Sequence, residues 1–303
     1  MPDPLLKTPV TSPALPNGAR YNEVRQKSSH NAFENSDETI FEQITLSNIH
    51  SLEVDLHKGK LGVDLDGDWY IYHRDILYPK TDADTFSLFL DKCKRMHNSK
   101  NDHEVFTMFL DIHDNFTDEA NHTAGRLDQL IESYLPGIVY TPGAFAGTSK
   151  TLRAAAQAGN WETIDNLKGK FIFVLTGANI DDEQSVLKQY VDNGASALTR
   201  KAFIAPETGR IESVASDPSV VFYNLAWGNR ALARKIFEWN FVSRVFPDTI
   251  LLPHEHTNIT TPEEWLDAVW NNVHHIATDC VSKASYPWSV LDDANGRPFQ
   301  KIQ

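Results

Sequence analysis

Hydrophobic and polar positions follow two patterns along this chain. Short apolar runs are separated by longer stretches in which apolar residues recur with helical spacing. Eight runs have the length and the β-branched or aromatic content of strands. They are residues 21–29, 50–57, 68–73, 103–113, 170–177, 219–226, 241–246 and 274–280. Helical spacing recurs in residues 82–97, 118–135, 181–193, 229–240 and 261–273. The last of these opens with Thr-Pro-Glu-Glu, a cap, a first-turn proline and two acids that favour a helix start there.

Strands that alternate with helices predict a parallel sheet with crossover helices on its faces. Eight strands favour closure, so the predicted fold is α/β, an irregular (β/α)8 TIM barrel with its active site at the carboxyl ends of the strands. The irregularity is at residues 58–68, because this link between two strands reads as a turn and is too short for a helix. Residues 1–20 are dotted with proline, so we expect a loose N-terminal segment and one catalytic barrel domain over residues 21–303.

Composition and charge exclude several classes of protein. The 303 residues are 41% hydrophobic and 11% aromatic, as in ordinary globular proteins. The net charge of −13 and the lack of a basic run argue against nucleic-acid binding. No apolar run reaches the roughly 18 residues of a spanning helix, and the first residues lack the pattern of a signal peptide. Cys93 and Cys280 can form at most one disulfide.

Polar residues gather where the predicted strands end. Glu53 and Asp55 alternate with apolar residues, so their side chains point to the same side of their strand. Asp111 and His113 share a face in the same way at the end of a very apolar strand. Two further strands end at His30, Asn31 and His73. In a barrel of this kind, all of these residues lie on one rim.

Three carboxylates on one rim repel one another unless a cation neutralises them. Any one acid at a strand end is more often a helix cap or a salt-bridge partner, but Glu53, Asp55 and Asp111 together predict a divalent metal. The Asn31 amide could supply a fourth oxygen. An all-oxygen set suits Ca²⁺ or Mg²⁺ rather than Zn²⁺. Histidines beside such a site are candidates for general base and general acid, because their pKa lies near working pH.

The order and spacing of these motifs resemble the catalytic X region of phosphoinositide-specific phospholipase C, most closely its calcium-dependent bacterial and fungal single-domain branch. The motifs are "SSHNAF" at 28–33, "LEVD" at 52–55, "YH" at 72–73 and "FLDIH" at 109–113. The resemblance extends to residues 261–288 and covers most of residues 21–290. It implies that His30 and His73 are the catalytic pair. It also implies one Ca²⁺ with four ligands, Asn31, Glu53, Asp55 and Asp111.

The resemblance implies a calcium-dependent phosphodiesterase that cleaves phosphatidylinositol to diacylglycerol and an inositol phosphate, through inositol 1,2-cyclic phosphate. His30 would take the proton of the 2-hydroxyl group, and His73 would protonate the leaving diacylglycerol oxygen. Asp111 stands where animal enzymes have Glu. Val174 and Thr176 stand where those enzymes have two lysines that bind ring phosphates, which implies a preference for unphosphorylated phosphatidylinositol.

The expected partner is phosphatidylinositol or a related inositol phosphodiester at a membrane interface. The same resemblance implies a secreted protein, which we expect to be a monomer without a transmembrane segment or a nucleic-acid partner. Further candidates for contact with the substrate are Arg74, His113, Lys201, Trp227 and Asp279. Asp279 could also orient a catalytic histidine.

Two alternatives remain open. Mg²⁺-dependent glycerophosphodiester phosphodiesterases and sphingomyelinase D-like lipases share the barrel, a Glu-x-Asp metal pair and two histidines. The former begin with His-Arg-Gly, whereas this chain reads His30-Asn31-Ala32. The second alternative is an inert barrel that only binds inositol lipid or serves as an interaction scaffold.

Overall fold

The protein is described here by a computed structural model that covers residues 12–33, 38–72, 84–179, 181–182, 184–210, 212, 217–249, 256–257, 259 and 261–303. Its strands are β1 (Val24–Ser29), β2 (Ser51–His57), β3 (Gly59–Lys60), β4 (Val63–Asp64), β5 (Tyr70–Ile71), β6 (Phe106–Ile112), β7 (Phe171–Thr176), β8 (Phe203–Ile204), β9 (Phe222–Ala226), β10 (Val242–Phe246), β11 (Asp248–Thr249), β12 (His256–Thr257), β13 (His275–Thr278) and β14 (Gln300–Lys301).

The α-helices are α1 (Ile40–Thr45), α2 (Phe86–Ser99), α3 (Ala124–Tyr134), α4 (Pro142–Ala146), α5 (Leu152–Gln157), α6 (Val186–Tyr190), α8 (Leu232–Glu238) and α9 (Pro262–Trp270). Short 3₁₀ turns are η2 (Tyr21–Glu23), η3 (Glu119–Asn121), η4 (Trp227–Asn229) and η5 (Pro287–Ser289). Within the described part of the chain, no helix combines the length and the apolar composition that crossing a bilayer needs.

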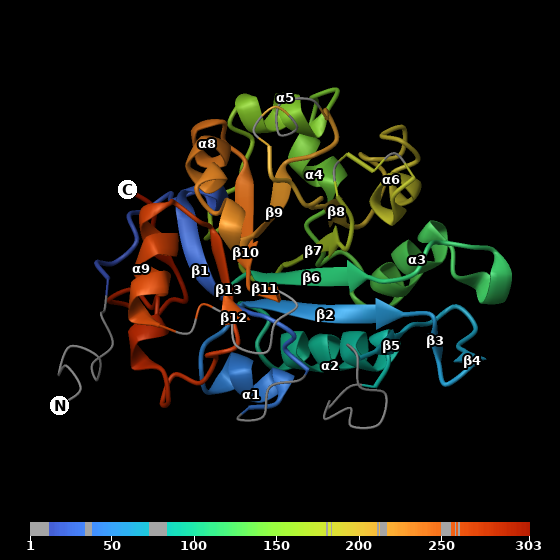
Figure 1. Cartoon of the computed structure of the whole chain (residues 1–303), viewed down its shortest axis with the longest axis horizontal. Helices are drawn as coiled ribbons and strands as arrows, with labels where there is room; N and C mark the ends of the chain where they lie inside the picture. The colour runs from blue at the N-terminus through green and yellow to red at the C-terminus, as the bar shows by residue number, and fades with distance from the viewer. Residues whose placement is uncertain are drawn as a thin grey trace.

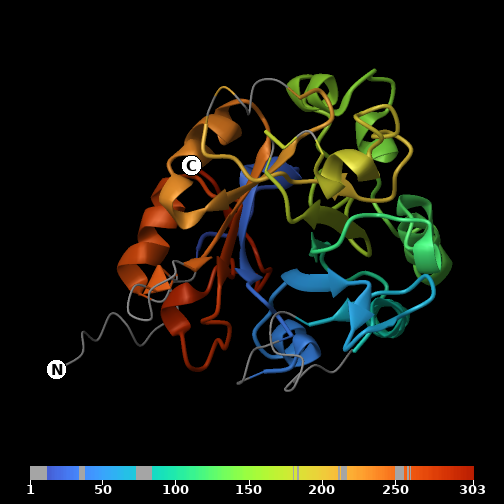
Figure 2. The same ribbon diagram turned by 45° about the vertical axis from the view of Figure 1, so that its right-hand side comes forward.

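Eight parallel strands form the barrel, in the order β8-β7-β6-β2-β1-β13-β10-β9 (Figure 1). The gap between β8 and β9 is bridged just past β8, where the Asn224 amide donates to the Pro206 carbonyl over 3.1 Å and the Thr208 amide donates to the Asn224 carbonyl over 3.3 Å. Helices lie around the outside of this sheet (Figure 2). The predicted irregular (β/α)8 barrel is therefore confirmed.

The predicted strand at 68–73 is wrong as a barrel strand. Of the described residues 68–72, Tyr70–Ile71 forms a strand, and it pairs antiparallel with β2, with Ile71 opposite Leu56. The link from β2 is the β3–β4 hairpin, which is too short for a parallel crossover, so the chain returns antiparallel. The eighth barrel strand is β8, which is only two residues long and pairs parallel with β7.

The amino-terminal half of the barrel interior is packed and closed. The Tyr21 ring stacks on Trp161 at 5.6 Å between centroids and lies 6.2 Å from the Phe222 ring. Its hydroxyl is hydrogen-bonded to Thr107 Oγ1 at 2.7 Å and to His275 Nε2 at 3.0 Å. Because this end is filled, the interior can meet substrate only at the carboxyl ends of the strands.

Local helix signals agree with the predicted elements. In α9, Thr261 Oγ1 accepts from the Glu264 amide and Glu264 accepts from the Thr261 amide, the capping box that the Thr-Pro-Glu-Glu sequence predicts. In α2, Thr85 caps the start and the buried face includes Phe86, which packs against the β7 ring of Phe173. Both helices thus have a buried apolar face, which includes Phe86 in α2 and Trp265 in α9.

Two other sequence features can be located. Cys93 and Cys280 are both buried free thiols. Of the N-terminal segment, residues 12–20 are described, and the Leu15 amide donates to Asp293 Oδ2 over 3.0 Å while the Ser12 amide donates to the Asp292 carbonyl. This stretch therefore lies against the C-terminal part of the chain.

Candidate active site

His30 follows directly after β1 and lies at the carboxyl end of the barrel. Its amide donates to the Thr278 carbonyl, at the end of β13, over 3.1 Å. Asn31 then turns in the left-handed region at φ 43°, a conformation that Asn tolerates, and its amide donates to Glu53 Oε2 over 3.2 Å. This turn places His30 Nε2 3.8 Å from Glu53 Oε2.

The His30 ring is held by a carboxylate on its other side. His30 Nδ1 lies 2.9 Å from Asp279 Oδ1, so Nδ1 carries the proton and Nε2 is left toward Glu53. Burial opposes the charged ring, but the hydrogen bond that Nδ1 donates to Asp279 and the charge of Glu53 outweigh it and raise the pKa of His30. A histidine in this setting can take up a proton and is fixed in orientation.

Three carboxylates project from two neighbouring strands beside His30. Glu53 and Asp55 come from β2 and are 5% and 1% exposed, so both side chains are buried. Asp111, on β6, is the direct register partner of Asp55. Register partners on neighbouring strands point to the same side of a sheet, so Asp55 and Asp111 share one face.

His113 links the last two of these carboxylates. Its Nε2 lies 3.2 Å from Asp55 Oδ2 and 3.3 Å from Asp111 Oδ2. Burial opposes a charged ring, but the two carboxylates raise the pKa of His113 to about 10. Burial raises the pKa of Asp55 to about 6, whereas at Asp111 the hydrogen bond from His113 overcomes burial and lowers the pKa. A protonated His113 thus offsets part of the negative charge of Asp55 and Asp111.

The donor set at this rim fits a hard cation. Asp55 Oδ1 is buried and has no hydrogen-bond partner among the described residues, so an acceptor is left over at the centre of the group. Asp111 Oδ1 accepts from Thr176 Oγ1 over 3.1 Å, which fixes that carboxylate. The carboxylates of Glu53, Asp55 and Asp111 and the side-chain amide oxygen of Asn31 are ligands of the kind that Ca²⁺ or Mg²⁺ prefers.

A nitrogen-rich metal site at the same place fits less well. Asp55, His57 and His113 offer ligand atoms within 4.8 Å of one another. However, the His57 and His113 rings are stacked, with centroids 4.4 Å apart and planes 9° from parallel. An imidazole nitrogen binds a metal in its own ring plane, so one ion cannot bind both stacked rings well. His57 instead stacks on Tyr72 at 4.0 Å, and burial lowers the pKa of His57 to about 4.

Arg244, on β10, is a site residue that the sequence analysis missed. Its side chain is fully buried, and its Nη2 lies 2.7 Å from Glu53 Oε2 without the alignment of a hydrogen bond. Nη1 donates to Asn224 Oδ1 over 2.9 Å, and the guanidinium lies 5.0 Å from the Phe109 ring centroid. The available signal was a charged residue within the apolar run "FVSRVF", on a strand expected to be buried on both faces.

The remaining predicted residues are not all brought to this group. His73 and Arg74 lie outside the described residues. Lys201 precedes β8 and pairs with Glu132, with Nζ 2.6 Å from Oε2, so the structure does not bring it to the rim group. Trp227 follows β9 and is 8% exposed, with the Arg230 guanidinium 4.2 Å from its ring centroid.

Comparisons with known proteins agree with this fold. A scan against protein-family models gave no match. A search of curated proteins gave none either. Among solved structures, a calcium-dependent phosphoinositol-specific phospholipase C from a Pseudomonas species matches with a TM-score of 0.75 and 19% identity, over 96% of this chain and 98% of that one.

Two further structures match in the same way. The Pseudomonas enzyme in a myoinositol complex has a TM-score of 0.74 at 19% identity, over 99% of this chain and 97% of that one. A Ca²⁺-dependent phosphatidylinositol-specific phospholipase C from Streptomyces antibioticus has a TM-score of 0.72 at 19% identity, over 89% of this chain and 98% of that one. The chain therefore has the barrel fold of these calcium-dependent enzymes.

Proposed function

We propose that this protein is a calcium-dependent phosphodiesterase that cleaves phosphatidylinositol to diacylglycerol and an inositol phosphate. The observation that carries the proposal is the His30–Asp279 pair, which lies beside the three carboxylates of Glu53, Asp55 and Asp111 at the carboxyl end of the barrel. A positioned base beside a hard-cation site can support phosphodiester cleavage by an internal hydroxyl group.

His30 is the proposed general base. Asp279 holds the proton on Nδ1, so the basic nitrogen is Nε2, on the side of Glu53. Nε2 would take the proton of the inositol 2-hydroxyl group as its oxygen attacks the adjacent phosphorus. Asp279 would stabilise the imidazolium that forms, as a carboxylate does in other histidine-dependent enzymes.

The proposed Ca²⁺ ligands are the side-chain amide oxygen of Asn31 and the carboxylates of Glu53, Asp55 and Asp111. Bound there, the ion supplies positive charge beside the phosphate oxygens. Arg244 holds Glu53 from inside the barrel, and Thr176 holds Asp111, so two of the ligands are fixed by neighbouring side chains. His113 lies between Asp55 and Asp111 and orients both.

The proposed general acid is His73, which would protonate the diacylglycerol oxygen as it leaves. This role, like contact of Arg74 with the phosphate, rests on the sequence resemblance. The substrate class has separate support, because a solved structure with this fold is a phospholipase C in complex with myoinositol. Val174 and Thr176 supply no cation on β7, which favours an inositol ring without further phosphates.

The proposed setting is a membrane interface. The β3–β4 hairpin continues from the carboxyl end of β2 and projects beyond its arrowhead (Figure 1). Leu61 and Val63 at its tip are 72% and 60% exposed. Apolar side chains at the edge of a site for lipid could enter the lipid surface. Secretion and a monomeric state stay predictions of the resemblance.

Replacement of His30 by Ala tests the proposal. We expect kcat on phosphatidylinositol to fall by about 10²- to 10⁴-fold, because a general base is lost. Ca²⁺ binding measured by calorimetry and the thermal unfolding midpoint should stay near those of the wild type. His97→Ala, at a partly exposed histidine at the end of α2, is the control. Unchanged turnover, or loss of the folded state, would refute the role of His30.

A further inference from the structure

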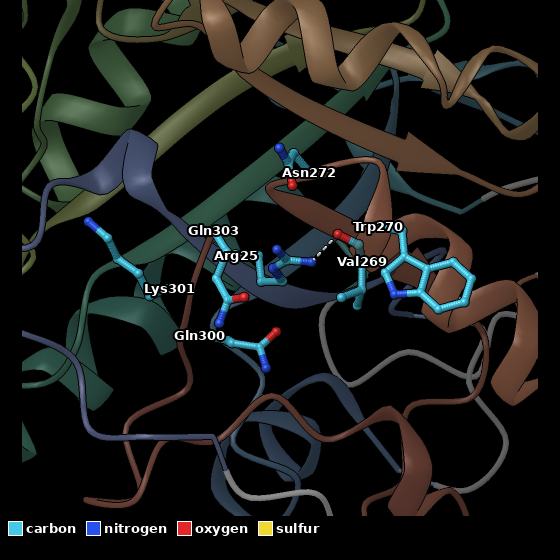
Figure 3. A pocket seen from close by; sticks show the side chains of 7 residues that line it. All are labelled: Arg25, Val269, Trp270, Asn272, Gln300, Lys301 and Gln303. Carbon is cyan, nitrogen blue, oxygen red and sulfur yellow. Dashed lines mark hydrogen bonds between the residues drawn. The ribbon is translucent and has the colours of Figure 1, made fainter.

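A polar cavity lies at the opposite end of β1 from His30. It has a volume of about 330 Å³, within the size of small-molecule sites. Its lining comes from the start of β1, the end of α9 and β14, and Figure 3 draws these side chains. The polar or aromatic ones are Arg25, Trp270, Asn272, Gln300, Lys301 and Gln303.

The lining of this cavity contains no carboxylate side chain, although the protein is acidic. The chain as a whole has 41 Asp and Glu against 28 Lys and Arg. Three carboxamides and two cations face the cavity. The nearest acid that the structure pairs with the lining is Glu23, whose Oε2 lies 2.7 Å from Lys301 Nζ. Because Glu23 pairs with Lys301, the preference of the cavity for an anion rests on Arg25.

Arg25 is the unsatisfied group in this cavity. It is 3% exposed, and its Nη1 donates to the Val269 carbonyl, the bond dashed in Figure 3. Its Nε is buried and has no hydrogen-bond partner among the described residues. Burial lowers the pKa of Arg25 to about 10, and no carboxylate of the described residues forms an ion pair with this side chain. A buried guanidinium without an acid is costly, so an anionic partner would stabilise it.

We propose that this cavity binds a small phosphate-bearing anion, separate from the candidate active site. The guanidinium edge that includes Nε is not used by Val269, and this edge matches two oxygens of a phosphate group. The amides of Asn272 and Gln300 offer further donors, and the Trp270 ring, 66% exposed, forms one wall. The proposal does not depend on the chemistry at the other end of the barrel.

Titration of the whole protein with inorganic phosphate tests this site. Calorimetry and tryptophan fluorescence would be followed in the presence of a chelator, at constant ionic strength. We expect saturable binding of one phosphate per chain. Arg25→Lys keeps the positive charge but loses the paired donors of the guanidinium edge. It should weaken binding by about tenfold, the effect of one charge-assisted hydrogen bond.

Two control variants distinguish phosphate binding in this cavity from binding elsewhere on the protein. Arg234 also donates to a carbonyl of α9, that of Trp270 over 3.2 Å, but does not line the cavity, so Arg234→Lys should bind phosphate like the wild type. His30→Ala should also bind normally. No saturable binding, equal binding by Arg25→Lys and wild type, or binding that His30→Ala abolishes would each overturn the proposal.

Discussion

Single residues at the rim could be predicted when their polarity broke an apolar pattern at a strand end. Glu53, Asp55 and Asp111 were found in this way, because two-residue alternation fixes which side of a strand a residue faces. Arg244 was missed, although it contacts Glu53. The sequence shows that Arg244 is a charged residue within a strand, but it does not show which residue pairs with it. The partner, Glu53, lies on β2, far from Arg244 along the chain.

The contact between His30 and Asp279 leads to a prediction on pH dependence. Asp279 favours the protonated form of His30 and so helps to raise its pKa. A general base acts in its neutral form, so activity should rise as pH passes upward through this pKa. Asp279→Asn should lower the pKa and move the acid limb of the kcat/KM profile to lower pH.

The measurement is the pH profile of kcat/KM for Asp279→Asn and the wild type on the same phosphatidylinositol substrate. The maximum rate of the variant should also be lower, because the His30 ring loses the partner that orients it. An acid limb that stays in place, or moves to higher pH, would contradict the proposed role of this pair.

At the scale of elements, seven of the eight barrel strands coincide with predicted runs, because six or so residues of apolar alternation are a strong signal. For the eighth strand, the sequence predicted one barrel strand that is not there and missed the one that is. The run at 68–73 has a strand pattern, but its short connection to β2 forces antiparallel pairing. Phe203–Ile204 is a barrel strand, but two residues are too few to show a period. Its place is set by pairing with β7.

The β3–β4 hairpin gives the prediction at this scale. Leu61→Asp together with Val63→Asp should weaken binding to phosphatidylinositol vesicles by at least about tenfold, because two apolar side chains no longer enter the lipid. Cleavage of a soluble, short-chain substrate should be unchanged. Vesicle co-sedimentation and rates on both substrates give the comparison. Equal losses on the two substrates would mean that the hairpin shapes the site itself.

In the whole molecule, the two ends of the barrel differ in structure. The amino-terminal end is closed by Tyr21, Trp161 and their neighbours, and the carboxyl end carries the His30 and carboxylate group. A closed core beneath a polar rim allows the acids to stay buried and fixed while substrate approaches from one side. The barrel could be predicted from the alternation of elements. Closure of the barrel through Pro206, Thr208 and Asn224 could not be predicted, because these hydrogen bonds join residues from separate segments of the chain.

The most direct test is ³¹P NMR of phosphatidylinositol and phosphatidylcholine vesicles incubated with the protein in Ca²⁺, in Mg²⁺ and in chelator. We predict a cyclic inositol phosphate resonance that requires both Ca²⁺ and phosphatidylinositol. Glycerophosphate, phosphatidic acid or a cyclic lipid phosphate formed with Mg²⁺ would contradict the account in favour of a diesterase or phospholipase D-type activity. Absence of turnover under every condition would contradict it in favour of an inert barrel.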